Sequence, residues 1–162
     1  MMKRTTRVAS PLSAEEKLRI QFRKSLRRGY TKNAEMDPVV AEGITAIIEP
    51  EERMIVHVIS TKGQHYWFSD RRLLCNYDDG IHELLRYESV IKAHWMFKDF
   101  WTDRVKQLQS TEAASQFKAN YFDRLEIELQ DRLVVLEGLD QAYWPVLHFF
   151  WWVARTSMLP RP

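Results

Sequence analysis

The sequence is poor in the residues that form covalent or metal cross-links. It has one cysteine, Cys75, among 162 residues, which excludes an intramolecular disulfide. No Cys-x-x-Cys or His-x-x-x-His spacing occurs, and such spacings are typical of structural zinc sites. A chain of this length can instead bury about 68 to 70% of its unfolded surface. We therefore expect one domain with appendages, in a reducing compartment, and predict no metal site.

Long hydrophobic runs and glycine-rich loops are also missing. The longest apolar stretch, residues 142–154, contains Pro145 and His148 and is shorter than the ~18 residues of a spanning helix. The first ten residues are basic but have no apolar segment of signal-peptide length. These absences favour a cytoplasmic protein. The chain has five glycines and no glycine-rich phosphate loop, so we predict no cofactor.

The small net charge of +2 hides an uneven distribution. Residues 1–32 hold ten basic side chains and two acidic ones, a net charge of +8, which leaves −6 for the remaining chain. Such a split indicates a basic arm. The arm either meets an anionic partner or lies back on the acidic body of its own protein.

Within this arm, residues 13–28 have the pattern of an amphipathic helix. Ser13-Ala14-Glu15-Glu16 fits a capping box, and Gly29 is a typical helix end. Three apolar residues recur at every fourth position and form a narrow stripe: Leu18, Phe22 and Leu26. Burying leucine or phenylalanine contributes more than an exposed ion pair, so we expect this stripe to pack on the body. Asp37-Pro38 predicts a second helix start, with a short helix from Val39 to about Ala46.

From Arg53 onward the period changes to two, which indicates strands. Residues 54–60 and 64–69 flank Thr61-Lys62-Gly63 and predict a hairpin. A two-residue turn at Lys62-Gly63 would pair Ile59 with Tyr66, Val58 with Trp67 and His57 with Phe68. Both faces of this hairpin would then be largely apolar. We expect a barrel interior on one face and the helix from Ser13 on the other.

The remaining pattern predicts five more strands, an insertion and a final helix. Strands are expected at 71–77, 81–86 and 89–98, and residues 99–120 show helical spacing that indicates an insertion. Residues 121–130 and 132–137 predict a second hairpin, whose second strand is apolar enough to be covered on both faces. After Gly138, residues 139–155 predict a helix that is apolar around its circumference and must be covered.

Several motifs follow in an order that resembles bacterial pleckstrin-homology-like (PH-like) domains. They are Phe68-Ser69-Asp70-Arg71-Arg72-Leu73-Leu74, Leu85-Arg86-Tyr87-Glu88-Ser89-Val90, Leu125-Glu126-Ile127-Glu128-Leu129 and Leu136-Glu137-Gly138-Leu139. The resemblance covers about residues 53–155, with a basic arm and helices in 1–52, the insertion at 99–120 and a tail at 156–162. It implies an α+β fold, a bent antiparallel barrel of about seven strands capped by a C-terminal helix.

The resemblance also implies a binding scaffold more than an enzyme. The first hairpin loop of this chain has one basic residue, Lys62, whereas phosphoinositide-binding PH domains usually carry several there. We interpret the chain as a non-enzymatic scaffold for a protein or peptide partner, or for self-association, and predict no catalytic residues. Two alternatives stay open. The helix from Ser13 suits peripheral binding to an anionic membrane, and the basic arm suits nucleic acid, with Phe22 and Tyr30 as stacking platforms.

Candidate contact residues follow from these readings. The candidates for anion or partner contacts are Arg23, Lys24, Arg27, Arg28, Arg71 and Arg72, and the candidate interface aromatics are Trp151 and Trp152. Arg71 and Arg72 follow a strand end, where they either grip an anion or fix the bend through Asp70 and nearby carbonyls; we favour the structural role. His57 and Cys75 fall on apolar strands and are expected in the core.

Overall fold

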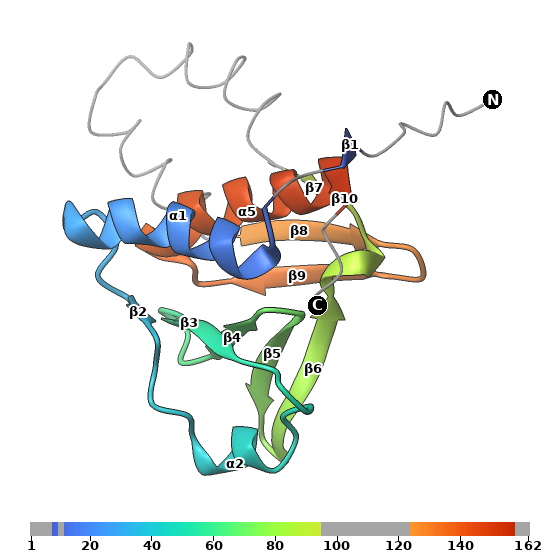
Figure 1. Ribbon diagram of the computed structural model, residues 1–162. Coiled ribbons are helices and arrows are strands. Elements are labelled where there is room, and N and C mark those ends of the chain that lie inside the picture. The colour runs from blue at the N-terminus through green and yellow to red at the C-terminus, as the bar shows by residue number, and fades with distance from the viewer. Residues whose placement is uncertain (1–7, 10–11, 95–123, 158–162) are drawn as a thin grey trace, which may run out of the picture.

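The structure is a computed structural model that describes residues 8–9, 12–94 and 124–157 (Figure 1). The expected insertion at 99–120 lies outside the described residues, as do the first three residues of the second hairpin. The fold is mixed α+β. Its helices are α1 (Ala14–Arg27), α2 (Glu42–Thr45) and α5 (Tyr143–Arg155), with short 3₁₀ turns η1 (Tyr87–Ser89) and η3 (Asp140–Ala142). Its strands are β1 (Val8–Ala9), β2 (Ala34–Met36), β3 (Met54–Ile59), β4 (His65–Ser69), β5 (Arg72–Tyr77), β6 (Gly80–Arg86), β7 (Val90–His94), β8 (Arg124–Leu129), β9 (Leu133–Glu137) and β10 (Thr156–Ser157).

The strands form two antiparallel sheets. One has the order β2-β3-β4-β5-β6 and the other β7-β8-β9, while β1 and β10 make a short parallel pair. The seven expected strands correspond to β3 to β9, but the expectation of a closed barrel is wrong: in the described part of the chain the two sheets stay separate. The turn η1 lies between β6 and β7, which do not pair with each other. The end of β9 meets the β3–β4 loop through a backbone hydrogen bond from Thr61 N–H to Gly138 O of 2.9 Å.

The first hairpin has a register one residue away from the predicted one. Ile59 pairs with His65, Val58 with Tyr66 and His57 with Trp67. The loop has three residues, because Ser60 N–H donates to Gln64 O at 2.7 Å and Gly63 adopts a positive φ of 81°. A three-residue loop with glycine in this conformation is a common hairpin connection. His57 and Trp67 therefore share one face, and the opposite face carries the core.

The core lies between the two sheets and the helices α1 and α5. Phe68 is fully buried, and its ring centroid lies 6.2 Å from that of Phe22 in α1 and 6.1 Å from that of Phe150 in α5. The helix α1 thus covers the core face of the hairpin, and its predicted position on the other face is wrong. The other face is covered by the α2 region, where Ile44 packs in a second cluster with Met54, Trp67 and Leu74. In Figure 1, α2 lies at the far end of the larger sheet from α1 and α5.

The start of α2 differs from the prediction. The helix begins at Glu42, and Asp37 has a φ of 50° instead of capping a helix. The Asp37 carboxylate accepts hydrogen bonds of 2.7 and 2.9 Å from Arg19 of α1, which lowers the Asp37 pKa. An ion pair with a distant helix therefore replaces the expected local cap.

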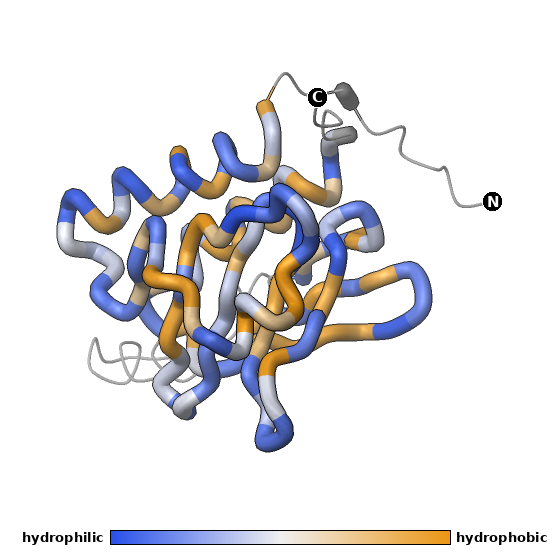
Figure 2. Tube along the Cα trace, turned by 60° about the horizontal axis from the view of Figure 1, so that its bottom comes forward, coloured by the Kyte–Doolittle hydropathy of each residue, from blue (hydrophilic) through white to orange (hydrophobic). Residues whose placement is uncertain are grey.

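The helix α1 is docked on the body. Its capping box is confirmed: Ser13 Oγ accepts from Glu16 N–H at 3.2 Å, and Ser13 N–H donates to the Glu16 carboxylate at 3.1 Å. Leu18 and Phe22 are fully buried, as the apolar stripe predicted. Hydrophilic and hydrophobic residues alternate along this helix in Figure 2, as expected for a helix with one buried side. Among the described residues, no helix combines the length and apolarity needed to cross a bilayer.

The second hairpin and the final helix follow the predicted order. Leu125, Ile127 and Leu129 of β8 are buried, but β9 is not covered on both faces, since Leu133 is 52% exposed. Gly138 then turns the chain toward α5 with a φ of 70°, and a Cβ atom there would collide with Ser60 Oγ. Only glycine fits this passage between the sheets. Seven of the thirteen residues of α5 are buried.

Truncation of the buried phenylalanine of α1 tests the importance of this docking. Phe22→Ala should lower the free energy of unfolding by about 3 to 5 kcal/mol, because a fully buried aromatic ring leaves a cavity. The neighbouring Arg23→Ala is the matched control and should change it by less than about 0.5 kcal/mol, since Arg23 is exposed. Urea unfolding of both variants measures the difference. Equal stability of the two variants would contradict a docked α1.

Candidate functional site

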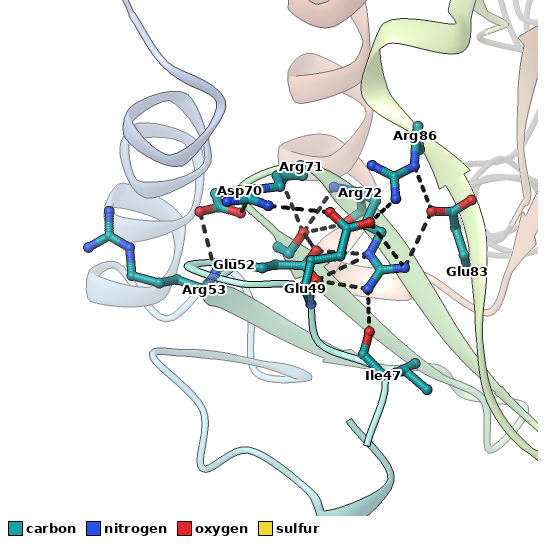
Figure 3. A network of polar contacts seen from close by, with 10 residues as sticks. Ile47, Glu49, Glu52, Arg53, Asp70, Arg71, Arg72, Glu83 and Arg86 are labelled. Atoms are coloured by element: carbon teal, nitrogen blue, oxygen red, sulfur yellow. Dashed lines mark hydrogen bonds and ion pairs between the residues drawn. The ribbon is translucent and has the colours of Figure 1, made fainter. Parts of the chain in front are cut away.

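The sequence motif at Ser69–Arg72 forms a buried polar corner between β4 and β5 (Figure 3). Arg72 is 7% exposed and donates from Nε and Nη2 to the two carboxylate oxygens of Glu52 at 2.9 and 2.8 Å. Its Nη2 also donates to the backbone oxygen of Ile47 at 2.8 Å. Ser69 Oγ donates to Glu52 at 2.7 Å and accepts from Arg72 N–H at 2.9 Å. Arg72 is therefore committed to holding the corner together.

A second layer of charges surrounds this pair. Arg71 donates to Glu49 at 3.3 Å, and Arg86 contacts both Glu49 and Glu83. The hydrogen bond from Arg86 lowers the pKa of Glu49. Burial opposes the ionised form of Glu52, but its hydrogen bonds, chiefly from Arg72, outweigh burial and lower its pKa as well. Both carboxylates are thus held ionised beside the arginines, which agrees with the structural role favoured for Arg71 and Arg72.

An open cavity of about 640 Å³ lies between this corner and the start of α1. It is lined by Ser13, Glu15, Glu16, Glu51, Glu52, Arg53 and Arg71. Most of these groups are already engaged. Glu16 belongs to the capping box, Glu15 pairs with Arg19 and Arg53, and Glu52 pairs with Arg72. Among these contacts, the pair of Glu15 with Arg53 attaches α1 to the body.

The four other predicted basic contacts lie together on the solvent side of α1. Arg23, Lys24, Arg27 and Arg28 are all exposed, and we call them the α1 basic face. They make no ion pair within the described part of the chain. The buried stripe fixes their direction, because residues on the opposite side of a docked helix must face solvent. They are separated along α1 from Arg71, which lies near its N-terminal end.

The predicted interface aromatics Trp151 and Trp152 are both half-buried. Trp151 Nε1 donates to Ala93 O at 3.1 Å, and the ring of Trp152 lies 6.1 Å from that of Phe149. A different tryptophan, Trp144, is the most exposed aromatic of α5, at 43%. Trp144 belongs to the predicted apolar helix of residues 139–155, which the sequence pattern expects to be covered. The signal that could have found it is the position of the polar residues His148 and Arg155, which fall on the same side of the helix.

These residues form one row that we call the α5 outer strip: Trp144, His148, Trp151 and Arg155. The ring centroids of Trp144 and His148 are 6.0 Å apart, those of His148 and Trp151 are 5.4 Å apart, and the Arg155 guanidinium lies 5.8 Å from the Trp151 centroid. Burial lowers the pKa of His148, and the charges of Lys17 and Arg155 lower it further. The strip therefore lies in a positive environment.

The helices α1 and α5 pack against each other and run antiparallel. Just after α1 ends, Thr31 Oγ1 donates to Gln141 O at 3.0 Å, and Gln141 lies just before the start of α5. Near the start of α1, the charge of Lys17 lowers the pKa of His148 in the second turn of α5. The structure thus brings α1, with Lys17, beside the α5 outer strip. The two segments are more than a hundred residues apart in the sequence.

Two predicted core residues have distinct surroundings. His57 stacks on Trp67 with ring centroids 3.7 Å apart, and its Nε2 lies 2.7 Å from Nδ1 of His65. Burial, with a smaller contribution from His65, lowers the pKa of His57 from 6.5 to about 4. Cys75 is buried, which raises its thiol pKa to about 11 and leaves it unreactive at neutral pH.

Comparisons with known proteins assign no family to the chain. No protein-family model matches it, and no curated protein or solved structure matches it either. Within the described residues, no group of three or more histidine, cysteine, aspartate or glutamate side chains is arranged to hold a metal ion. Any functional proposal therefore depends on the surfaces described above.

Separate and joint replacement of Arg72 and Glu52 tests the corner. Arg72→Met should lower the free energy of unfolding by about 3 to 5 kcal/mol, because it leaves the Glu52 carboxylate buried without its partner. The double variant Glu52→Leu with Arg72→Met should recover most of this loss. Arg71→Met is the control and should cost about 0 to 1 kcal/mol, since Arg71 is partly exposed. Urea unfolding that finds Arg72→Met as stable as Arg71→Met would refute the structural role.

The lowered pKa of His57 predicts loss of stability in mild acid. The folded pKa lies below the unfolded value, so the contribution of neutral His57 is complete above pH 6.5 and declines as the pH falls toward 4. The total loss should be about 3 kcal/mol. His57→Phe keeps the stacking on Trp67 and should flatten this pH dependence. Thermal unfolding between pH 7 and 4.5 measures it, and identical pH profiles for wild type and His57→Phe would disprove the effect.

Proposed function

We propose that the protein is a non-enzymatic PH-like scaffold that binds a protein partner through the α1 basic face. The observation that carries this proposal is the docking of α1. Its apolar side is buried, so Arg23, Lys24, Arg27 and Arg28 are held in fixed directions on the surface. Such a preorganised set of charges suits a partner with a complementary acidic surface, because little side-chain and backbone freedom is lost from the helix on binding.

The order of elements supports the PH-like part of the proposal. Four antiparallel strands, β3 to β6, are followed by three more, β7 to β9, and then by the helix α5. This is the order that the sequence motifs imply. The Ser69–Arg72 motif falls at a chain corner, as a signature that fixes a bend would. A scaffold of this kind uses its framework for position and its surface for recognition.

The docked α1 disfavours the membrane alternative in its original form. Leu18 and Phe22 would have to insert into the lipid interface, but both are fully buried. Exposing them would cost roughly 1.5 to 3 kcal/mol for each side chain. The nucleic-acid alternative also loses one of its two stacking platforms, because Phe22 is buried and only Tyr30 is exposed. A protein partner requires neither of these residues to move.

Charge reversal on the α1 basic face tests the proposal. The full chain is used to capture partners from a cell extract at physiological salt, and captured proteins are identified and their affinities measured with purified material. Reversing Arg23, Lys24, Arg27 and Arg28 to glutamate should weaken binding by about tenfold or more. The matched control reverses four exposed basic residues of the strands and hairpin loops, Lys62, Lys92, Arg124 and Arg132, and should leave binding unchanged.

Two further measurements separate the alternatives. Anionic vesicles, duplex DNA and single-stranded RNA are offered to both variants at low and physiological salt. We expect weak, salt-sensitive binding to all three. Tight binding to DNA at physiological salt, with a log-log salt slope near 0.9 for each phosphate contact, would overturn the protein-partner proposal if charge reversal abolished it. Tight vesicle binding that charge reversal abolished would do the same. Sedimentation of the free protein tests self-association.

A further inference from the structure

The outer surface of the α1–α5 pair carries two matched rows of side chains. On α1, Lys17, Gln21, Lys24 and Arg28 follow each other at spacings of four, three and four residues. On α5, Trp144, His148, Trp151 and Arg155 have the same spacings. Residues at these spacings lie along one side of a helix. The two helices pack together, and Lys17 is close enough to His148 to lower its pKa, so the rows lie side by side on one surface of the helix pair.

The first row is basic, and its charges are not neutralised within the described residues. Lys24 and Arg28 are exposed, Lys17 is partly exposed, and none of the three makes an ion pair there. Arg155 adds a further positive charge at the end of the second row. This surface therefore presents positive charges to solvent. A partner that carries carboxylates would be electrostatically complementary to it.

The second row is aromatic and keeps apolar area exposed. Trp144 is 43% exposed although its helix is otherwise the centre of the core. Tryptophan is a frequent contact point in protein interfaces, since it combines a large apolar area with few rotatable bonds. The row therefore supplies an apolar anchor beside the charges of the first row.

The angles between the rings favour a peptide over single-stranded nucleic acid. Trp144 and His148 are inclined at 65°, and His148 and Trp151 at 50°. Successive bases need rings whose faces are available in a roughly parallel series. The tilted rings of the strip do not present such a series, whereas a single apolar side chain can pack on one of them.

We propose that the surface formed by the two rows binds an acidic peptide segment of a partner protein. An apolar side chain of the segment packs on Trp144, and its carboxylates pair with Lys17, Lys24 and Arg28. This inference rests on the proposed scaffold function and specifies the partner segment. It also extends the contact beyond the α1 basic face to α5.

Selection from a random 12-residue peptide display library on the full chain tests this inference. Selected peptides should be enriched in aspartate and glutamate around one aromatic or aliphatic residue. Synthetic copies should bind at least tenfold more weakly when their acidic residues become amides, and oligo(U) RNA of 12 nucleotides should bind more weakly than the peptides. Selection of peptides without acidic enrichment, the absence of any enriched peptide, or tighter binding of the RNA would overturn it.

Variants on each row locate the bound peptide. Trp144→Ala should weaken peptide binding at least tenfold, and Lys17→Glu with Lys24→Glu should do so independently. Ile91→Ala and Lys92→Glu are matched controls on the three-stranded sheet, where Ile91 is 45% exposed, and should have no effect. Thermal unfolding confirms that each variant is folded. If charge reversal of the α1 basic face weakens partner binding but Trp144→Ala does not weaken peptide binding, this inference is wrong and the proposed function stands. If charge reversal of that face leaves partner binding unchanged, the proposed function itself is wrong.

Discussion

The contact between Phe22 and Phe68 is the interaction on which the rest of the structure depends. Phe68 lies at the centre of the core, where rings from α1 and α5 meet it from different directions. Through this contact the N-terminal helix becomes part of the folded body, although its composition is that of a basic arm. Burial of Leu18 and Phe22 also decides which side of α1 faces solvent. The direction of every basic side chain on the helix follows from it.

The docking of α1 divides the positive charge of the arm into two groups. Arg19 is used on the protein itself, where it pairs with Asp37 and Glu15. Arg23, Lys24, Arg27 and Arg28 point away from the body. The sequence left open whether the arm meets a partner or lies on its own acidic surface. In the structure Arg19 lies on that surface, and the side that we propose for a partner faces solvent. These four side chains make no ion pair among the described residues.

The corner at Ser69–Arg72 has the opposite character, because its charges are satisfied internally. Arg72 and Glu52 are both nearly inaccessible to solvent and bind each other through two hydrogen bonds. The Tyr87 hydroxyl donates to Ser69 O at 2.6 Å, which connects this corner to the turn between the two sheets. A pair of this kind adds little net stability, but the loss of one partner is costly, so it specifies the bend.

The sequence by itself determined the elements whose signals are local. The capping box at Ser13, the strand order from Met54 to Glu137 and the helix after Gly138 depend on neighbouring residues, and the structure has them where they were predicted. The tertiary structure decided what depends on distant ones. The alternation of side chains shows which residues share a face, but not which element covers that face, so the positions of α1 and α2 could not be predicted. The hairpin register depended on the loop around Gly63, and the partner of Asp37 lay on another helix. The α5 outer strip and the row that begins at Lys17 lie side by side only because α1 packs against α5. That contact joins residues far apart in the sequence, so no local pattern predicts it.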